Sequence, residues 1–469
     1  MNFKLNPWAC GPVAALAVAL AVVGCGGGGG GSSSGTVAPT SSVYSGPITG
    51  FGSVIVNGVR FDTVGANTVD DDGNPVRLED LRLGMMVTVG GDADDATSRG
   101  TATQLSLTHG TEGLITSINT GAGTLVLLGQ TVTTNASTIY EGVATLADLV
   151  VGDPIEVYGV LQSDNTLLAT LIEKKSGLLG VRLVGRMSAL DTTAKTFVVG
   201  GLTVDYNTAG VTGTLGDGKR VKVKASAGPV AGVLTATSVK VNEGAANGEN
   251  VAANSYLKLK GIAETAPVNG LLKVSGTPVD VSAARFEGGS SIAAGQFIKV
   301  KGIWDGSVLK ATKVQVGADD NDRNELYGAV SSLTTDGTTT TIVVHDVTVS
   351  VTADTVFEHG NIGLLAVGSY VEIKGHVVDG VLVATKVELK TGSDATGHDF
   401  EDHGLVADFV SVSSFKVNGV PVDATNAIFE HGKSAADLAN GVYVEIKGAL
   451  NAGGVFVATK IEVKGHPPV

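Results

Sequence analysis

The sequence predicts an all-β protein built from six tandem copies of one small five-stranded barrel. Three observations indicate this class. The chain has 469 residues with 66 Gly and only 5% aromatic residues, which favours several small β units over a few large cores. Aliphatic residues alternate with polar ones at period two in many short segments. One residue pattern also recurs six times along the chain.

The recurring pattern is aliphatic-x-x-Gly-x-x-aliphatic-x-aliphatic-x-small. Its last two copies run from Leu365 to Gly375 and from Leu438 to Gly448. The central glycines are Gly84, Gly152, Gly218, Gly295, Gly368 and Gly441, at spacings of 66 to 77 residues. We expect each central glycine to take a positive φ ahead of a strand. The small residue that closes the pattern is expected to allow a tight bend.

Two further marks accompany the pattern. An Ala-Thr step follows every copy, at Ala102-Thr103, Ala169-Thr170, Ala236-Thr237, Ala311-Thr312, Ala384-Thr385 and Ala458-Thr459. An Asn-Gly pair precedes it at Asn57-Gly58 and Asn418-Gly419, where a type I′ hairpin turn requires positive φ at both residues. Asp346 and Gly200-Gly201 occupy comparable places in other copies.

The elements of one unit can be read in order from the last copy. A first strand opens at Gly404, a hairpin spans Phe415 to Val422, and one or two helical turns follow at Ser434 to Leu438. The fourth strand, Val444 to Gly448, alternates apolar and charged residues, so one face is expected to be buried and the other solvated. A fifth strand completes the unit. Five strands with a helical piece after the third resemble a closed OB-like barrel.

Barrel closure removes open edges from units that are too small to bury a large core. We therefore expect six barrels that fold almost independently, as in a repeat array. The predicted organisation is a signal peptide (1–24), a Gly/Ser tether (25–44), repeats at 45–109, 110–177, 178–244, 255–317, 325–390 and 402–466, and polar linkers at 245–254, 318–324 and 391–401.

The N-terminus resembles a bacterial lipoprotein signal. Lys4 precedes an apolar stretch, Gly11 to Val23, which is of signal-peptide length and too short to span a bilayer comfortably. The stretch ends in Val22-Val23-Gly24-Cys25, and the resemblance implies lipidation of Cys25 after cleavage before it. An ordinary secretory signal is the alternative. The glycines and serines that follow predict a flexible tether, and no Asp follows Cys25, which by analogy favours the outer membrane of a Gram-negative host.

Charge and cysteine content exclude several functions. The formal net charge of −14 opposes binding to nucleic acid or to anionic lipid headgroups. Both cysteines, Cys10 and Cys25, lie in the N-terminal segment, so the repeats are predicted to have no disulfide, no cysteine metal site and no thiol nucleophile. No hydrolase or metalloprotease motif occurs in the chain. The prediction is a protein without enzymatic activity or cofactor.

The combined repeat marks resemble a widespread bacterial domain of unknown function, which occurs singly and in tandem in exported lipoproteins. The likeness covers the chain from Gly46 to Gly465. Copies one to three depart most from it, because Ala225 replaces the closing glycine and Asp70-Asp71-Asp72 enlarges a loop. The resemblance brings no catalytic residues with it.

Four copies carry an aromatic residue and a glutamate before the helical turn, at Tyr140-Glu141, Phe286-Glu287, Phe357-Glu358 and Phe429-Glu430. Histidines follow in the last two, so Glu358, His359, Glu430 and His431 are candidate ligand-binding residues. The alternative interpretation makes the aromatic a core residue and the glutamate a cap near a helix N-terminus. Two ligands in each unit are too few for a tight zinc site, so no metal is predicted.

Three polar clusters have residue types suited to cations. His398 to His403 combines two imidazoles with three carboxylates, and the alternative for it is a solvated linker. Asp319 to Asp322 and Asp70 to Asn74 carry oxygen ligands suited to Ca²⁺, but neither continues as an EF-hand loop.

These observations predict a non-catalytic, lipid-anchored protein of the cell envelope that acts as a multi-domain spacer, scaffold or interaction module. Its expected partners are the membrane, through the lipidated N-terminus, and an envelope protein or glycan. The alternative is a ligand-binding array that uses OB-like faces for an oligosaccharide or peptide, with weak binding of divalent metal.

Overall fold

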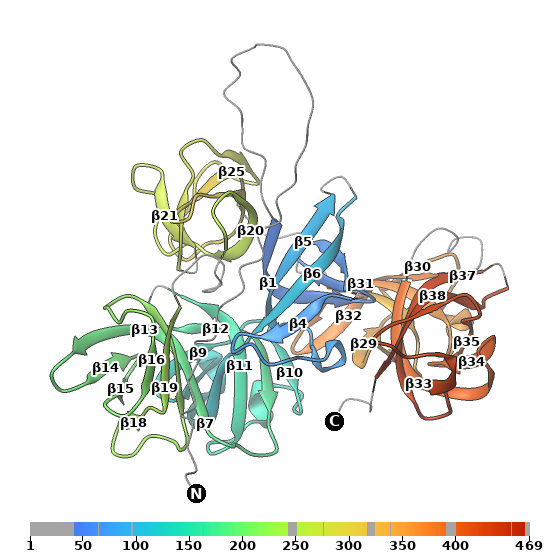
Figure 1. Cartoon of the computed structure of the whole chain (residues 1–469), viewed down its shortest axis with the longest axis horizontal. Helices are drawn as coiled ribbons and strands as arrows, with labels where there is room; N and C mark the ends of the chain where they lie inside the picture. Colours follow the sequence, from blue (N-terminus) through green and yellow to red (C-terminus); the bar gives the residue numbers. More distant parts are fainter. Residues whose placement is uncertain are drawn as a thin grey trace, which may run out of the picture. The chain divides into compact units, whose positions relative to one another are not determined.

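The computed structural model describes residues 42–63, 65–94, 97–162, 164–242, 251–274, 276–316, 324–337, 339–390, 400–451 and 453–464. The predicted signal peptide and Cys25 lie outside these residues. The described repeats belong to one compact unit and consist of β-strands with short 3₁₀ helices (Figure 1). None of the described residues forms a helix with the length and apolar character needed to cross a membrane.

The first three repeats contain the following elements. Repeat 1 has β1 (Ser42–Phe51), β2 (Val54–Val56), β3 (Val59–Asp62), β4 (Asn67–Asp70), η1 (Leu78–Asp80), β5 (Met86–Asp94) and β6 (Arg99–Thr108). Repeat 2 has β7 (Thr111–Asn119), η2 (Thr120–Ala122), β8 (Thr124–Leu127), β9 (Gln130–Thr133), β10 (Ile139–Glu141), η3 (Leu146–Asp148), β11 (Pro154–Leu161) and β12 (Leu167–Lys174). Repeat 3 has β13 (Val181–Asp191), β14 (Thr196–Val199), β15 (Leu202–Asp205), β16 (Gly210–Thr212), β17 (Arg220–Ala225), β18 (Val233–Thr235) and β19 (Ser238–Asn242).

The last three repeats follow the same plan. Repeat 4 has β20 (Ser255–Ile262), β21 (Leu271–Val274), β22 (Thr277–Asp280), β23 (Arg285–Glu287), β24 (Phe297–Trp304) and β25 (Leu309–Val316). Repeat 5 has β26 (Asn324–Ala329), β27 (Ser332–Asp336), β28 (Thr339–Val344), β29 (Val347–Val351), β30 (Val356–Glu358), η4 (Ile362–Leu364), β31 (Tyr370–Val378) and β32 (Val381–Leu389). Repeat 6 has β33 (Phe400–Ser411), β34 (Ser414–Val417), β35 (Val420–Asp423), β36 (Ile428–Phe429), η5 (Ala435–Asp437), β37 (Tyr443–Leu450) and β38 (Phe456–Lys464).

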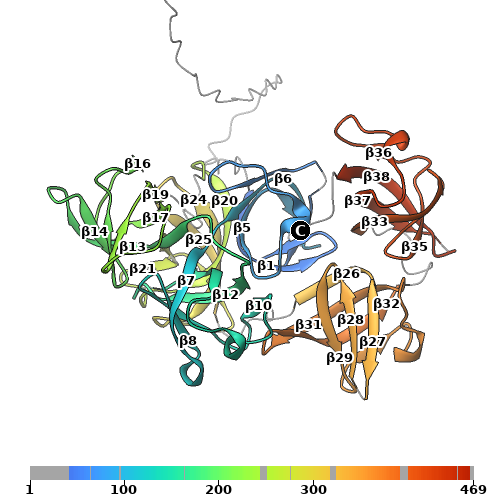
Figure 2. The same cartoon turned by 90° about the horizontal axis from the view of Figure 1, so that it is seen from below.

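Each repeat closes into a small barrel, which confirms the predicted fold class. In repeat 6, β33 pairs with β34 and β34 pairs with β35, both antiparallel. Strand β35 then pairs in parallel with β38, and the antiparallel pairs β38–β37 and β37–β33 complete the circle. The cyclic order first-second-third-fifth-fourth is that of an OB-like barrel. Figure 2 looks along the barrel of repeat 1, between β1, β5 and β6.

The structure adds one short strand that the sequence did not predict. Strand β36 pairs in parallel with β38, further along β38 than the part that pairs with β35. Strands β10, β23 and β30 pair in the same way with β12, β25 and β32 of their repeats. The predicted helical turn after it is a single 3₁₀ turn in repeats 1, 2, 5 and 6. This short strand carries the aromatic-Glu pairs of repeats 2, 4 and 5, and in repeat 6 it ends at Phe429, directly before Glu430.

The two strongest repeat marks meet at a β-bulge. Residue Gly448 lies opposite Ala458, and the register of β37 and β38 shifts between Lys447 and Gly448. The hydroxyl of Thr459 donates to the carbonyl of Lys447 at 3.1 Å. Repeats 1, 4 and 5 reproduce both features, at Gly91, Gly302 and Gly375. The closing glycine is therefore required because a Cβ there would meet the facing backbone at this bulge.

The backbone conformations predicted for the turns are confirmed. All six central glycines have φ between 79° and 95°. Asn57 and Gly58 have φ of 55° and 74°, and Asn418 and Gly419 have φ of 49° and 80°, as a type I′ turn requires. Each central glycine also donates its N–H to the first strand of its own repeat, as Gly441 does to Val406 at 2.8 Å.

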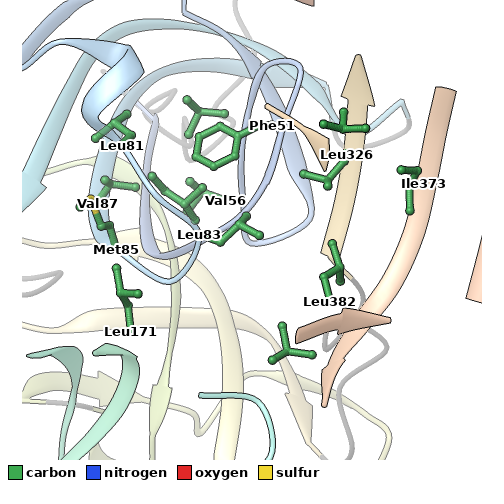
Figure 3. Close-up of a cluster of buried hydrophobic side chains, with 14 of the residues drawn as sticks. Phe51, Val56, Leu81, Leu83, Met85, Val87, Leu171, Leu326, Ile373 and Leu382 are labelled. Atoms are coloured by element: carbon green, nitrogen blue, oxygen red, sulfur yellow. The ribbon is translucent and has the colours of Figure 1, made fainter. Parts of the chain in front are cut away.

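The expectation of nearly independent barrels was wrong, because the barrels share sheets and a core. The start of β1 pairs in parallel with β20 of repeat 4, and its end pairs with β26 of repeat 5. One buried hydrophobic cluster contains Phe51 of repeat 1, Leu171 of repeat 2 and Leu326 of repeat 5 (Figure 3). Tyr44, which the sequence placed in the tether, is 1% exposed within β1 and belongs to this cluster.

Candidate functional site

The predicted residues Glu430 and His431 lie at the end of β36, beside β38. The parallel register pairs Phe429 with Ile461, so Glu430 comes next to Glu462 of the neighbouring strand. The Nε2 atom of His431 lies 3.3 Å from Oε1 of Glu462. One ligand atom from each of the three residues lies within 4.8 Å of the other two. The structure thus brings a third ligand, Glu462, to the two that the sequence singled out.

Repeat 5 places Glu358 and His359 at the corresponding positions. The Nδ1 atom of His359 lies 3.3 Å from Oε1 of Glu388, the equivalent of Glu462. Glu358 is held by Lys386 at 2.6 Å. The sequence could have indicated Glu388 and Glu462, because both follow the Ala-Thr mark at the same distance, but only the parallel pairing of the short strand brings them to the Glu-His pair.

The glutamates are not helix caps. The N-caps of η3, η4 and η5 are Thr145, Asn361 and Ser434, and in η3 and η5 Asp148 and Asp437 complete a capping box. The aromatic residues do pack against the cores, as the alternative interpretation expected; they are Tyr140, Phe286, Phe357 and Phe429.

The carboxylates of the acidic loop of repeat 1, which the sequence offered as calcium ligands, contact lysines of repeat 3. The Nζ atom of Lys222 lies 2.8 Å from Asp71 and 2.6 Å from Asp72, and the side chain of Lys222 is only 2% exposed. Lys224 lies 2.5 Å from Asp72. Asp70 accepts hydrogen bonds from Asn74 within the loop. The three carboxylates therefore already have charged or hydrogen-bonding partners.

The His398–His403 segment does not act as a solvated linker over its described part. Strand β33 begins at Phe400, and Glu401 and Asp402 are 6% and 3% exposed. Glu401 accepts hydrogen bonds from the backbone N–H and the hydroxyl of Thr63 in repeat 1, at 3.4 and 3.5 Å. Burial, reinforced by the carboxylate of Glu445, raises the pKa of Glu401 to about 8. His398, Asp399 and Asp319 to Asp322 lie outside the described residues.

Two half-buried histidines face each other between repeats 5 and 6. The Nδ1 atoms of His345 and His403 lie 3.2 Å apart, and Nε2 of His345 donates to the carbonyl of Tyr327 at 2.6 Å. His345 occupies the turn position that Asn57 and Asn418 hold in their repeats, where the side chain also donates to a first-strand carbonyl. Burial lowers the pKa of His345 to about 3 and that of His403 to about 4, so both rings are neutral near pH 7.

Charged contacts also join the other repeats. Arg82 of repeat 1 contacts Glu141 of repeat 2 at 2.9 Å. Arg182 of repeat 3 contacts Glu112 and Glu156 of repeat 2, and Arg186 contacts Glu264 of repeat 4. Lys447 of repeat 6 contacts Asp62 of repeat 1. The charged face of β37 was expected to be solvated, but in repeat 6 it packs on repeat 1, where Glu445 is 7% exposed.

A cavity of about 510 Å³ lies where repeats 1, 2, 4 and 5 meet. Apolar residues such as Ile48, Ile139 and Phe297 line it together with the amides of Asn135 and Gln162. Its volume is within the range typical of small-molecule sites, which extends over roughly 300–1,000 Å³.

Comparison with family models identifies the family of the repeated domain. The model of a domain of unknown function, DUF5666, matches residues 112–173, 184–240, 262–315, 327–388 and 403–462. These matches cover repeats 2 to 6 and more than half of the chain, so the chain belongs to this family, and the resemblance noted from the sequence is confirmed. Repeat 1 is not matched, although it forms the same barrel.

Other comparisons add little. A search of curated proteins finds no match. Among solved structures, the chain is similar to a structure titled Drosophila Unr CSD456, with 16% identity, 45% of this chain and 90% of that chain covered, and a TM-score of 0.12.

Proposed function

We propose that the chain is a non-catalytic, lipid-anchored scaffold of the cell envelope, in which repeat 1 holds the other repeats in a fixed arrangement. The observation that carries this proposal is the number of direct contacts that repeat 1 makes. Its first strand extends the sheets of repeats 4 and 5, and its acidic side chains bind Lys222 of repeat 3 and Lys447 of repeat 6. A flexible spacer would need none of these contacts.

The kinds of contact support a fixed arrangement. Parallel strand pairing fixes both distance and register, and a one-residue slip would turn every side chain to the wrong face. Lys222 is buried, and a buried ion pair loses its favourable energy when either partner is removed. Such contacts give specificity of arrangement even where they add little net stability.

Carbodiimide cross-linking of the full chain tests the arrangement. The reagent joins an amine and a carboxylate that are in direct contact, so amide bonds between Lys222 and Asp72 and between Lys447 and Asp62 are expected in peptides identified by mass spectrometry. Scattering in solution should give a radius of gyration near that of a compact chain of this size, about 22 Å. A radius roughly twice as large, without these cross-links, would support a string of separate barrels.

The lipid anchor belongs to the same proposal and is supported by the Val22 to Cys25 sequence. Replacement of Cys25 by Ala is expected to move the protein from the membrane fraction to the soluble fraction, because acyl chains supply the anchoring energy, about 0.8 kcal/mol for each buried CH₂. Mass spectrometry of the N-terminal peptide would detect the acyl groups directly. If Cys25→Ala remains in the membrane pellet, the anchor is not a lipid on this residue.

The cavity between repeats 1, 2, 4 and 5 supports a second candidate function, the binding of a small ligand by the assembled repeats. Its lining combines apolar side chains with amides and Lys260, which suits a polar molecule such as a sugar unit. Native mass spectrometry of protein isolated from its host would detect a retained ligand of this kind.

A further inference from the structure

The Glu-His pair of repeat 6 and its partner strand form a cluster that the scaffold proposal does not use. Glu430 and His431 directly follow strand β36, and Glu462 lies on the neighbouring strand β38. The two carboxyl side chains are largely buried, at 16% and 17% exposure, whereas His431 is 65% exposed. One ligand atom from each of the three residues lies within 4.8 Å of the other two, so small side-chain rotations would bring all three to a common ion at bonds of about 2.0–2.2 Å.

Both carboxylates retain an oxygen for such an ion. Lys460 lies 3.5 Å from Oε1 of Glu430, and Lys464 lies 2.8 Å from Oε2 of Glu462. Within the described residues, Oε2 of Glu430 is buried and accepts no hydrogen bond. Oε1 of Glu462 faces the imidazole of His431. Each lysine thus contacts one oxygen of a carboxylate and leaves the other oxygen for the ion. Residues that contact metal ligands commonly orient them in this way.

The other repeats show what the cluster requires. At the position of His431, repeats 2 and 4 carry Gly142 and Gly288, both with positive φ. The residues before these glycines, Glu141 and Glu287, pair with Glu173 and Gln315, which hold the position of Glu462. His359 and His431 have φ of 55° and 53°. Two repeats therefore carry histidine at a position whose left-handed backbone conformation favours glycine. Each imidazole lies against the carboxylate of the neighbouring strand, in two separate repeats.

We propose that Glu430, His431 and Glu462 bind a divalent transition ion of the Zn²⁺ type, with a remaining position open to water. One imidazole and two carboxylates are suited to Zn²⁺ more than to Ca²⁺, which takes six to eight oxygen ligands. Repeat 5 binds more weakly, because lysines already occupy its carboxylates: Lys386 lies 2.6 Å from Glu358, and Lys390 lies 2.7 Å from Oε1 of Glu388, the oxygen that faces His359. This site is independent of the scaffold function.

Isothermal titration of the full chain with Zn²⁺ tests the proposal, in a Cys10→Ser/Cys25→Ser background because free thiolates bind zinc. One strong binding event is expected. His431→Gly and Glu462→Gln install the residue types that other repeats carry at these positions, so both variants are expected to fold. Each should weaken the strong event by at least tenfold, because loss of even an outer partner of a metal ligand costs about 10–100-fold.

Two variants serve as controls. His376→Ala removes an exposed histidine on β31, far from the cluster in the sequence, and should leave the strong event unchanged. His359→Gly should abolish only a weaker event. Circular dichroism checks that all variants fold, and Co²⁺ substitution should give absorption bands in the background protein that His431→Gly lacks. Absence of Zn²⁺ binding, equal affinity of His431→Gly and the background protein, or equal loss with His376→Ala would overturn the proposal.

Discussion

Repeats 5 and 6 have nearly the same sequence in their fourth strands but use the charged residues in opposite ways. In the shared register, Glu325 lies opposite Lys374 in repeat 5, and Glu401 lies opposite Lys447 in repeat 6. Lys374 contacts Glu325 of its own repeat at 3.1 Å. In repeat 6 both side chains turn to repeat 1, where Lys447 contacts Asp62 and Glu401 accepts from Thr63.

The comparison shows that an ion pair within a barrel has been exchanged for two contacts between barrels. Repeat 5 docks on repeat 1 through its backbone, by the pairing of β1 with β26, so its charged side chains remain available to each other. Repeat 6 has no strand paired with repeat 1 in the described residues and docks through side chains. The same repeat sequence can therefore be attached in two physically different ways.

The largest effect is expected for Gly50→Ala, which disrupts the pairing of β1 with β26 of repeat 5. A Cβ at Gly50 would lie far inside van der Waals contact with the carbonyl oxygen of Glu325. The strands must separate, and the unfolding free energy should fall by about 3 kcal/mol, at the upper end of overpacking effects. Hydrogen exchange at Phe51 and Leu326 should rise. Gly210→Ala is the control, because a Cβ there meets nothing within 4 Å; an equal loss in both variants would contradict the prediction.

Lys447→Met attacks the side-chain docking of repeat 6 and is compared with Lys374→Met. The side chain of Lys447 is 12% exposed against 33% for Lys374. Loss of a largely buried partner should cost about 2 kcal/mol, and loss of the more exposed one less than about 1 kcal/mol. Urea denaturation measures both values. Similar losses would show that the two lysines have equivalent environments after all.

The attachment of repeat 6 is also expected to depend on pH, unlike that of repeat 5. Burial raises the pKa of Glu401 to about 8 and that of Asp402 to about 7, above their values in the unfolded chain. A raised acid pKa stabilises the folded state below the unfolded pKa, and this stabilisation is lost as the pH rises through the folded pKa. Stability should therefore fall between pH 5 and pH 8.

Other titratable groups at the junction of repeats 1, 5 and 6 change the stability outside the range from pH 5 to pH 8, or change it in the opposite direction. The lowered pKa values of His345 and His403 remove stability as the pH falls from about 6.5 towards 3, so the optimum lies near pH 5–6. Lys447, whose pKa burial lowers to about 8, titrates mainly above the window. Thermal unfolding of Glu401→Gln/Asp402→Asn should show a much flatter profile between pH 5 and 8. An unchanged profile would assign the dependence to other groups.

The smallest effect is expected for His359 and His431, the two histidines with a left-handed backbone in repeats 5 and 6. In the absence of metal, His359→Gly and His431→Gly should each stabilise the protein by about 0.5 kcal/mol, because relief of a left-handed residue outweighs the added entropy of glycine in the unfolded chain. Saturating Zn²⁺ should reverse the order for His431→Gly alone, since the ion stabilises only proteins that bind it. Thermal midpoints with and without Zn²⁺ measure this.

Much of the barrel could be predicted from local patterns. Positive φ at Asn418-Gly419 and at the central glycines follows from turn chemistry that a few adjacent residues specify. The role of Gly448 was predicted only in part, because the bulge that requires it depends on a residue of the next strand. For a similar reason, the sequence predicted only two of the three residues of the candidate site. Glu430 and His431 are adjacent in sequence, whereas Glu462 joins them only through the parallel pairing of β36 with β38.

By itself the sequence determined the repeat, its all-β character, its turns and the approximate ends of its six copies, since each depends on residues a few positions apart. Only the tertiary structure decided how the copies meet. The partners of Asp72, Asp62 and Thr63 lie between 150 and 385 residues away, on barrels whose local patterns are almost the same. A charged residue on a repeated strand face satisfies local rules equally well in water or against a neighbour, so packing between barrels selects between the two.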